Sequence, residues 1–168
     1  MITKKICMVG VFGTGKTSLV QRFVHTKFSD RYHSTVGVKL DRKVVAVDGT
    51  DITLVLWDLA GRDGHEDVNG SYLRGAHGMI YVGDGTRQET VDQLGDLRRH
   101  AMESAGEVPS VTALNKSDLV DAWTVSRADE AALAAQGGLF RTSAKSGVGV
   151  EEMFLHLTRA ITAAAGKS

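Results

Sequence analysis

The chain has 168 residues, which predicts a single domain over residues 1–168 that buries a hydrophobic core without disulfide or metal support. Its 20 basic and 20 acidic residues give a formal net charge of zero, so no bulk field favours nucleic acid or an anionic membrane as a partner. A hydrophobic fraction of 42% and a charged fraction of 24% exclude a disordered or coiled-coil chain, and the single cysteine excludes an intrachain disulfide.

Strand-like and helix-like segments alternate along the chain. Apolar runs rich in Val and Ile predict strands, and apolar residues spaced three and four apart predict helices. Asp48-Gly49 separates two strand-like runs and is typical of a hairpin, so these two strands are expected to be antiparallel. In chain order we expect strand 4–9, helix 16–25, strands 38–47 and 52–59, strand 78–84, helix 87–105, strand 110–115, helix 126–136, strand 139–143 and a last helix on Val150, Met153, Phe154, Leu157 and Ile161.

This order predicts an α/β fold with a six-stranded, mainly parallel sheet, one antiparallel edge strand and about five helices. In such a sheet ligands bind at the carboxyl ends of the strands. No apolar stretch approaches the ~18 residues of a membrane-spanning helix. The end of the chain, AAAGKS, has no cysteine to lipidate, so we expect a cytoplasmic protein with no direct membrane anchor.

Residues 10–17, GVFGTGKT, follow the first strand and open the first helix. They fit the pattern G-x-x-x-x-G-K-S/T, in which glycines let backbone N–H groups surround a phosphate. Lys16 would reach the β and γ oxygens, and the Thr17 hydroxyl would ligate Mg²⁺. The alternative is a glycine-rich turn with an incidental lysine, which the position between strand and helix disfavours. The loop predicts a nucleoside triphosphate site without choosing the base.

Two motifs at the ends of later strands favour guanine. Asn115-Lys116-Ser117-Asp118 ends one strand, and Thr142-Ser143-Ala144-Lys145 ends the next. The carboxylate of Asp118 can accept two hydrogen bonds, as guanine N1–H and N2–H₂ offer, whereas adenine has no donor at either position. Each motif alone is a weak signal, but their order and their places at strand ends predict a GTP site.

With these motifs in order, the chain resembles the Ras-like small GTPases, most closely the Rab branch. The resemblance covers nearly the whole chain through GVFGTGKT, YHSTVGV, WDLAG, SYLRGAHG, NKSD and TSAK. It implies the P-loop small GTPase fold, GTP/GDP and Mg²⁺ as cofactors, and hydrolysis of GTP to GDP. It also implies two switch segments that the γ-phosphate orders and that partner proteins read.

The resemblance also implies roles for single residues. Phe28 would pack over the guanine, Thr35 would close on Mg²⁺ and the γ-phosphate, and Asp58 would hold a Mg²⁺-bound water. The Gly61 N–H would contact the γ-phosphate, and the Ala144 N–H the guanine O6. The residues expected to bind nucleotide are Gly13, Thr14, Gly15, Lys16, Thr17, Ser18, Phe28, Thr35, Asp58, Gly61, Asn115, Lys116, Asp118, Ser143, Ala144 and Lys145; Thr17, Thr35 and Asp58 would serve the metal, and Lys16, Thr35, Gly61 and Arg62 would serve catalysis.

Two departures from the family predict slow hydrolysis. Arg62 stands where most of the family has a glutamine, and a guanidinium cannot accept a hydrogen bond from the attacking water. Phe12 stands where the family carries a small residue, beside the space for the γ-phosphate. Alternatively, Arg62 stabilises charge in the transition state, in which case Asp63 or His65 would have to position the water.

Leu40, Trp57 and Tyr72 stand where Rab proteins have an exposed aromatic cluster that effectors grip. We expect this patch to bind effectors, exchange factors or activating proteins; the alternative for Trp57 is a place partly in the core. We expect a monomer that does not bind nucleic acid. Recruitment to a membrane would need a partner, or a tail absent from this chain.

The function predicted from the sequence is a GTP-binding molecular switch with slow, Mg²⁺-dependent hydrolysis. The first alternative is a GTP-locked scaffold with negligible turnover. The second is a small P-loop kinase. The kinase is disfavoured because the chain lacks an obvious arginine-rich lid or acceptor segment, and because the two base motifs would then have no role.

Overall fold

The computed structural model describes residues 1–26, 28, 37–59 and 70–167. Thr35, Gly61 and Arg62 therefore lie outside the described residues, as do Asp63 and His65. The sequence-based expectations for these five positions stay predictions.

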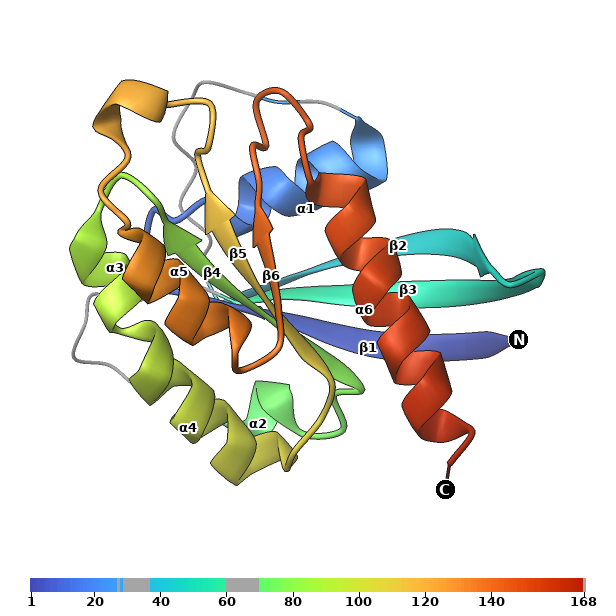
Figure 1. Ribbon diagram of the computed structural model, residues 1–168. Helices are drawn as coiled ribbons and strands as arrows, with labels where there is room; N and C mark the ends of the chain where they lie inside the picture. Colours follow the sequence, from blue (N-terminus) through green and yellow to red (C-terminus); the bar gives the residue numbers. More distant parts are fainter. Residues whose placement is uncertain (27, 29–36, 60–69, 168) are drawn as a thin grey trace.

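Six strands form one sheet in the order β2-β3-β1-β4-β5-β6 (Figure 1). The hairpin pair β2–β3 is antiparallel, and every other neighbouring pair is parallel. Both the mainly parallel sheet and its antiparallel edge strand are thus confirmed. The strands are β1 (Ile2–Val9), β2 (Val38–Val47), β3 (Thr50–Leu59), β4 (Gly78–Asp84), β5 (Ser110–Asn115) and β6 (Gly138–Arg141).

The predicted helices are present except that the segment 87–105 is divided, and the structure adds two short helical segments, residues 70–73 and 120–122, that the sequence did not predict. The single helix expected over residues 87–105 is two helices, α3 and α4, interrupted at Gln93. Val91 and Leu94 nevertheless pack into the same apolar layer, so apolar periodicity could not show the break. The helical segments are α1 (Lys16–His25), α2 (Gly70–Leu73), α3 (Gln88–Asp92), α4 (Leu94–Ala105), the 3₁₀ turn η1 (Val120–Ala122), α5 (Arg127–Ala134) and α6 (Val150–Ala165).

Two apolar layers cover the two faces of the sheet. Along a strand, successive side chains point alternately into one layer and into the other. On β1, Ile6 and Met8 face α1 and α6, whereas Cys7 and Val9 face α2, α3 and α4. The strand β4 is buried along its whole length because helices cover both of its faces. The described residues contain no helix with the length and apolar character needed to cross a bilayer.

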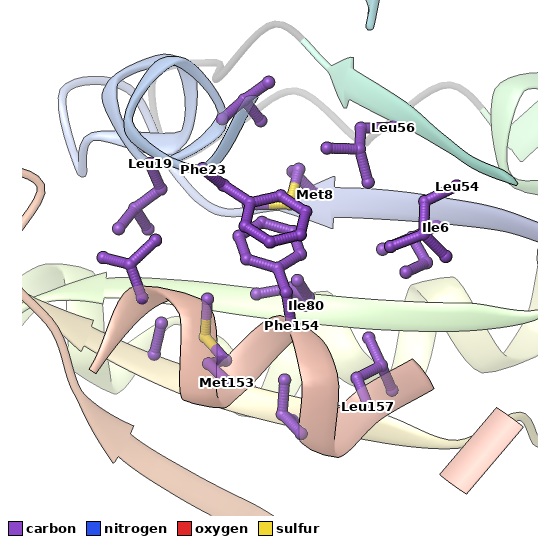
Figure 2. Close-up of a cluster of buried hydrophobic side chains, with 14 of the residues drawn as sticks. Ile6, Met8, Leu19, Phe23, Leu54, Leu56, Ile80, Met153, Phe154 and Leu157 are labelled. Atoms are coloured by element: carbon purple, nitrogen blue, oxygen red, sulfur yellow. The ribbon is translucent and has the colours of Figure 1, made fainter. Parts of the chain in front are cut away.

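The layer that contains Ile6 and Met8, called here the first layer, holds the helix that follows the glycine-rich loop. Phe23 of α1 and Phe154 of α6 stack with ring centroids 4.0 Å apart and planes 5° apart. Figure 2 shows the two rings between Leu19 of α1 and the strand residues Met8 and Ile80. This packing holds α1 against the sheet, so the amino end of α1 has a defined position beside the ends of β1 and β4.

The parallel strands bring their carboxyl ends to one edge. β1 ends at Val9, directly before the glycine-rich loop, while Asp84 and Asn115 are register partners at the ends of β4 and β5. On the other side of β1, Asp58 of β3 lies opposite Met8. The candidate site is therefore built at the edge where the sequence predicts a ligand.

Candidate functional site

The glycine-rich loop between β1 and α1 has a backbone that side chains would disrupt. Gly13 has φ +77° and Gly15 has φ +99°, in the left-handed region that glycine tolerates. A Cβ on Gly15 would lie 2.2 Å from Asn115 Nδ2. The glycine before Lys16 is therefore required both by its dihedral angle and by the close approach of the base motif.

Lys16 is buried inside this loop. Its Nζ donates to the carbonyl oxygens of Gly10, at 3.0 Å, and Val11, at 3.3 Å. Burial lowers the pKa of the Lys16 ammonium to about 8, although the nearby Asp58 carboxylate opposes the shift. A buried cation enclosed by loop backbone is suited to bind an anionic group entering the loop.

Thr17 and Asp58 form the second polar cluster. The Thr17 hydroxyl donates to Asp58 Oδ2 at 2.5 Å, and the carboxylate is fully buried. Among the described residues, nothing hydrogen-bonds to Asp58 Oδ1. Burial raises the pKa of Asp58, and the hydrogen bond from Thr17 together with the charge of Lys16 acts against that rise.

This pair fits a hard divalent cation. Hydroxyl and carboxylate oxygens are the donors that Mg²⁺ prefers, and a buried carboxylate oxygen without a hydrogen-bond partner gains from a cation beside it. Thr17 and Asp58 could therefore hold Mg²⁺, directly or through water. The third residue expected at the metal, Thr35, lies outside the described residues.

Asn115 connects the two halves of the site. Its Nδ2 donates to the Thr14 carbonyl oxygen at 3.0 Å, and its Oδ1 accepts from the Thr142 hydroxyl at 3.1 Å. All three residues are buried. The Asn115 side chain thus ties the glycine-rich loop, β5 and the segment after β6 into one unit, which explains why an amide is needed at this position.

Asp118 presents a carboxylate at the surface of the same edge. Its Oδ1 accepts from the Ser143 hydroxyl at 2.8 Å, and the Ser143 oxygen in turn accepts from the backbone N–H of Ser146 at 3.0 Å. These bonds fix the carboxylate while leaving it exposed. Asp118 is therefore suited to accept hydrogen bonds from a ligand with two adjacent donors.

Arg22 contacts the TSAK segment, and the sequence reasoning missed this residue. It lies on α1, and its Nε donates to the Ala144 carbonyl oxygen at 2.7 Å while its Nη2 donates to that of Lys145. Ala144 is buried and the Lys145 side chain is exposed. The first helix thus fixes the backbone of the TSAK segment. The arginine has no local sequence signal, because its partners are 122 and 123 residues away.

Asp84 is the second residue that the sequence reasoning missed. It ends β4 and its buried carboxylate pairs with Lys116 Nζ at 2.8 Å. Burial alone would raise the pKa of Asp84, but hydrogen bonds from Lys116 and Thr86 outweigh burial and hold that pKa below its usual value. A usable signal existed: Asp84 is a carboxylate at the end of a fully apolar strand, at the edge where ligands bind.

Three other predicted residues occupy peripheral places. Ser18 is half-buried in the first turn of α1. The Phe28 ring is exposed, and so is that of Phe12 at the tip of the glycine-rich loop. The structure places Phe12 on that loop, and the role of Phe28 at the base stays a prediction.

Leu40, Trp57 and Tyr72 come together from three elements. Leu40 of β2 is the register partner of Trp57 of β3, and the Trp57 and Tyr72 ring centroids are 6.3 Å apart. Leu40 is exposed, and the other two are half-buried against the second apolar layer. Lys5 Nζ lies 3.7 Å from the Trp57 ring centroid. Trp57 therefore belongs partly to the core and partly to a surface patch.

Comparison with known proteins agrees with this geometry. Residues 5–163 match the Ras family. The chain is 36% identical over 163 residues to Ras-related protein RABD2b of Arabidopsis thaliana, covering 94% of this chain and 79% of the relative. It is 38% identical over 165 residues to Ras-related protein Rab-1 of Theileria annulata, covering 94% and 73%. It is 35% identical over 163 residues to Ras-related protein Rab-1D of Dictyostelium discoideum, covering 94% and 78%.

Proposed function

The chain belongs to the Ras family, in its Rab branch, and on this premise we propose that residues 1–168 form one guanine-nucleotide-binding domain that hydrolyses GTP slowly. A single observation carries the proposal. Lys16, Thr17 and Asp58 gather at the same sheet edge as Asn115 and Asp118, so one ligand can reach a phosphate site and a base site together.

We assign the roles from the family resemblance, and the geometry supports them. The loop backbone and Lys16 would bind the β- and γ-phosphates, and Thr17 with Asp58 would hold Mg²⁺, which would neutralise phosphate charge. Asp118 accepts from the guanine N1–H and N2–H₂, while Asn115 positions the loop. The backbone of Ala144, fixed by Arg22, donates to the guanine O6.

The switch itself depends on residues outside the described part of the chain. Thr35 and Gly61 would move toward a bound γ-phosphate and release when it is lost, so that a partner protein can distinguish the two states. Leu40, Trp57 and Tyr72 offer the partner an apolar patch. We propose that this patch binds effectors, exchange factors and activating proteins. We further propose that the protein is a cytoplasmic monomer.

The proposal also includes slow GTP hydrolysis. At Arg62 a guanidinium can donate to phosphate oxygens but cannot accept from the attacking water. Phe12 adds a bulky ring to the loop that faces the γ-phosphate. Both changes leave nucleotide binding intact and weaken the positioning of water, which favours a long-lived GTP state over rapid cycling. The alternative with negligible turnover rests on the same two residues.

The proposed function is tested by the nucleotide that the purified protein carries. We expect heat denaturation to release about one guanine nucleotide per chain, and excess EDTA to speed its loss, because Mg²⁺ helps hold the phosphates. Single-turnover decay of loaded GTP then separates a slow GTPase from a locked scaffold. Release of adenine nucleotide, or phosphoryl transfer to a small molecule, would contradict the proposal.

Arg62→Gln is expected to speed single-turnover GTP hydrolysis by about tenfold, which corresponds to ~1.4 kcal/mol of the activation barrier. The glutamine amide can both accept from and donate to the attacking water. Arg62→Ala is the matched comparison, because it removes the guanidinium without supplying an acceptor. No gain with glutamine would show that Arg62 does not limit hydrolysis, whereas complete loss of hydrolysis with alanine would show that Arg62 assists the reaction.

A further inference from the structure

Arg87 links the glycine-rich loop to the base motif at residues 115–118. It lies directly before α3, and its Nη2 donates to the Phe12 carbonyl oxygen at 2.9 Å. Its Nε donates to Asp84 Oδ2 at 3.1 Å, and the same carboxylate oxygen lies 2.8 Å from Lys116 Nζ. A chain of polar contacts therefore runs from Phe12 through Arg87 and Asp84 to Lys116.

The carboxylate at the centre of this chain is held in place on all sides. Asp84 is buried, and its second oxygen, Oδ1, accepts from the backbone N–H of Thr86 at 2.8 Å and from the Thr86 hydroxyl at 2.6 Å. The backbone N–H of Arg87 donates to the Asp84 carbonyl oxygen at 3.0 Å. Arg87 thus extends from a turn whose backbone is fixed by hydrogen bonds.

The neighbouring residue, Gly85, is fixed as firmly. Its N–H donates to the Asn115 carbonyl oxygen at 3.0 Å, and its own carbonyl accepts from the N–H and the hydroxyl of Thr124. A Cβ on Gly85 would lie 2.0 Å from the nearest atom of the Trp123 ring, so the indole occupies the space that a side chain would need. The turn that carries Arg87 is therefore built against the base motif.

The contact with the Phe12 carbonyl has a consequence for the next amide. In a trans peptide unit the C=O and the following N–H point in opposite directions, and the described residues contain no cis peptide bond. A Phe12 carbonyl directed at Arg87 therefore directs the Gly13 N–H away from Arg87. We propose that Arg87 is a positioning residue for the nucleotide, because it orients the Gly13 N–H toward the phosphates and couples this orientation to the base motif.

This inference rests on the proposed function, since the Gly13 N–H has no such role without a phosphate in the loop. Arginine suits the task because its planar fork reaches Asp84 and Phe12 with two separate nitrogens. Lysine carries its three donors on one nitrogen, so it lacks the two separately placed donor nitrogens that the guanidinium uses here. The guanidinium is partly exposed, so the expected effect on binding is moderate.

Arg87→Ala is expected to raise the dissociation rate of fluorescent N-methylanthraniloyl-GDP by about 5- to 10-fold. The ³¹P resonance of the β-phosphate of bound GDP should shift at the same time, because the loop amide nearest to it is no longer fixed. Arg87→Lys should retain only part of the effect of the arginine. Arg99→Ala is the control: Arg99 is an exposed arginine of α4 paired with Asp96, and its loss should leave the dissociation rate within about twofold.

Three results would overturn the inference, and they are distinguishable. A wild-type protein that carries no guanine nucleotide removes the proposed function and this inference with it. A wild-type protein that binds GDP, with an Arg87→Ala variant that releases it at the same rate, removes only the role of Arg87. A faster release with an unchanged β-phosphate resonance and a lowered melting temperature shows that Arg87 supports the fold without positioning the loop.

Discussion

Gly15→Ala is expected to destabilise the folded chain by about 2–4 kcal/mol and to abolish stoichiometric nucleotide binding. Two costs add. Alanine at φ +99° adopts a backbone conformation that side chains rarely tolerate, and its Cβ would lie 2.2 Å from Asn115 Nδ2. Asn115 must then move, which breaks its hydrogen bond to the Thr14 carbonyl and leaves buried polar groups without partners.

Gly49→Ala is the matched control for this variant. Gly49, in the β2–β3 hairpin, has φ +80°, but a Cβ there would meet nothing within 4 Å. It reports the backbone cost alone, about 1 kcal/mol, and should retain nucleotide. Urea unfolding gives the two free energies, and the nucleotide content of the purified proteins gives the second readout. Equal destabilisation in the two variants would show that the contact with Asn115 contributes nothing.

The fold was predictable because its signals are local. Asp48-Gly49 predicted the hairpin, and β4 reads as a buried strand from its unbroken apolar run. The interruption at Gln93 was not predictable, since the residues on both sides of it bury the same face. The short turns α2 and η1 are likewise too short to produce an apolar period.

A site residue could be predicted where the spacing of a local motif fixes the role of that residue. Gly15 and Lys16 lie within a motif whose spacing fixes both roles, and the structure gives each the environment that the motif requires. Arg22 and Arg87 were not predicted because their partners lie far away in the sequence or on another loop. Asp84 carried one signal, its place at the end of a strand at this edge, but the sequence does not show that Lys116 pairs with it. Only the fold shows which arginine supports which motif.

Asp118→Asn is expected to weaken GDP binding by about 10²- to 10⁴-fold and to create affinity for xanthosine diphosphate. The structure sets the orientation of the new side chain. Ser143 donates to Asp118 Oδ1, so an asparagine keeps its amide oxygen at that position and presents Nδ2 to the base. Two donors, the Nδ2–H₂ group and the guanine 2-amino group, then face each other. Xanthine has a carbonyl oxygen in place of the guanine 2-amino group, and this oxygen can accept from Nδ2.

A change of preference from GDP to xanthosine diphosphate distinguishes altered base recognition from a general loss of structure. A variant that lost GDP because its loop had collapsed would bind xanthosine diphosphate no better than the parent does. Asp121→Asn removes the same charge from an exposed position three residues away and should leave both affinities unchanged. Titration of both nucleotides against the three proteins measures the effect. If Asp118→Asn keeps its preference for GDP, then Asp118 does not read the base, and the choice of guanine must come from the backbone around Ala144.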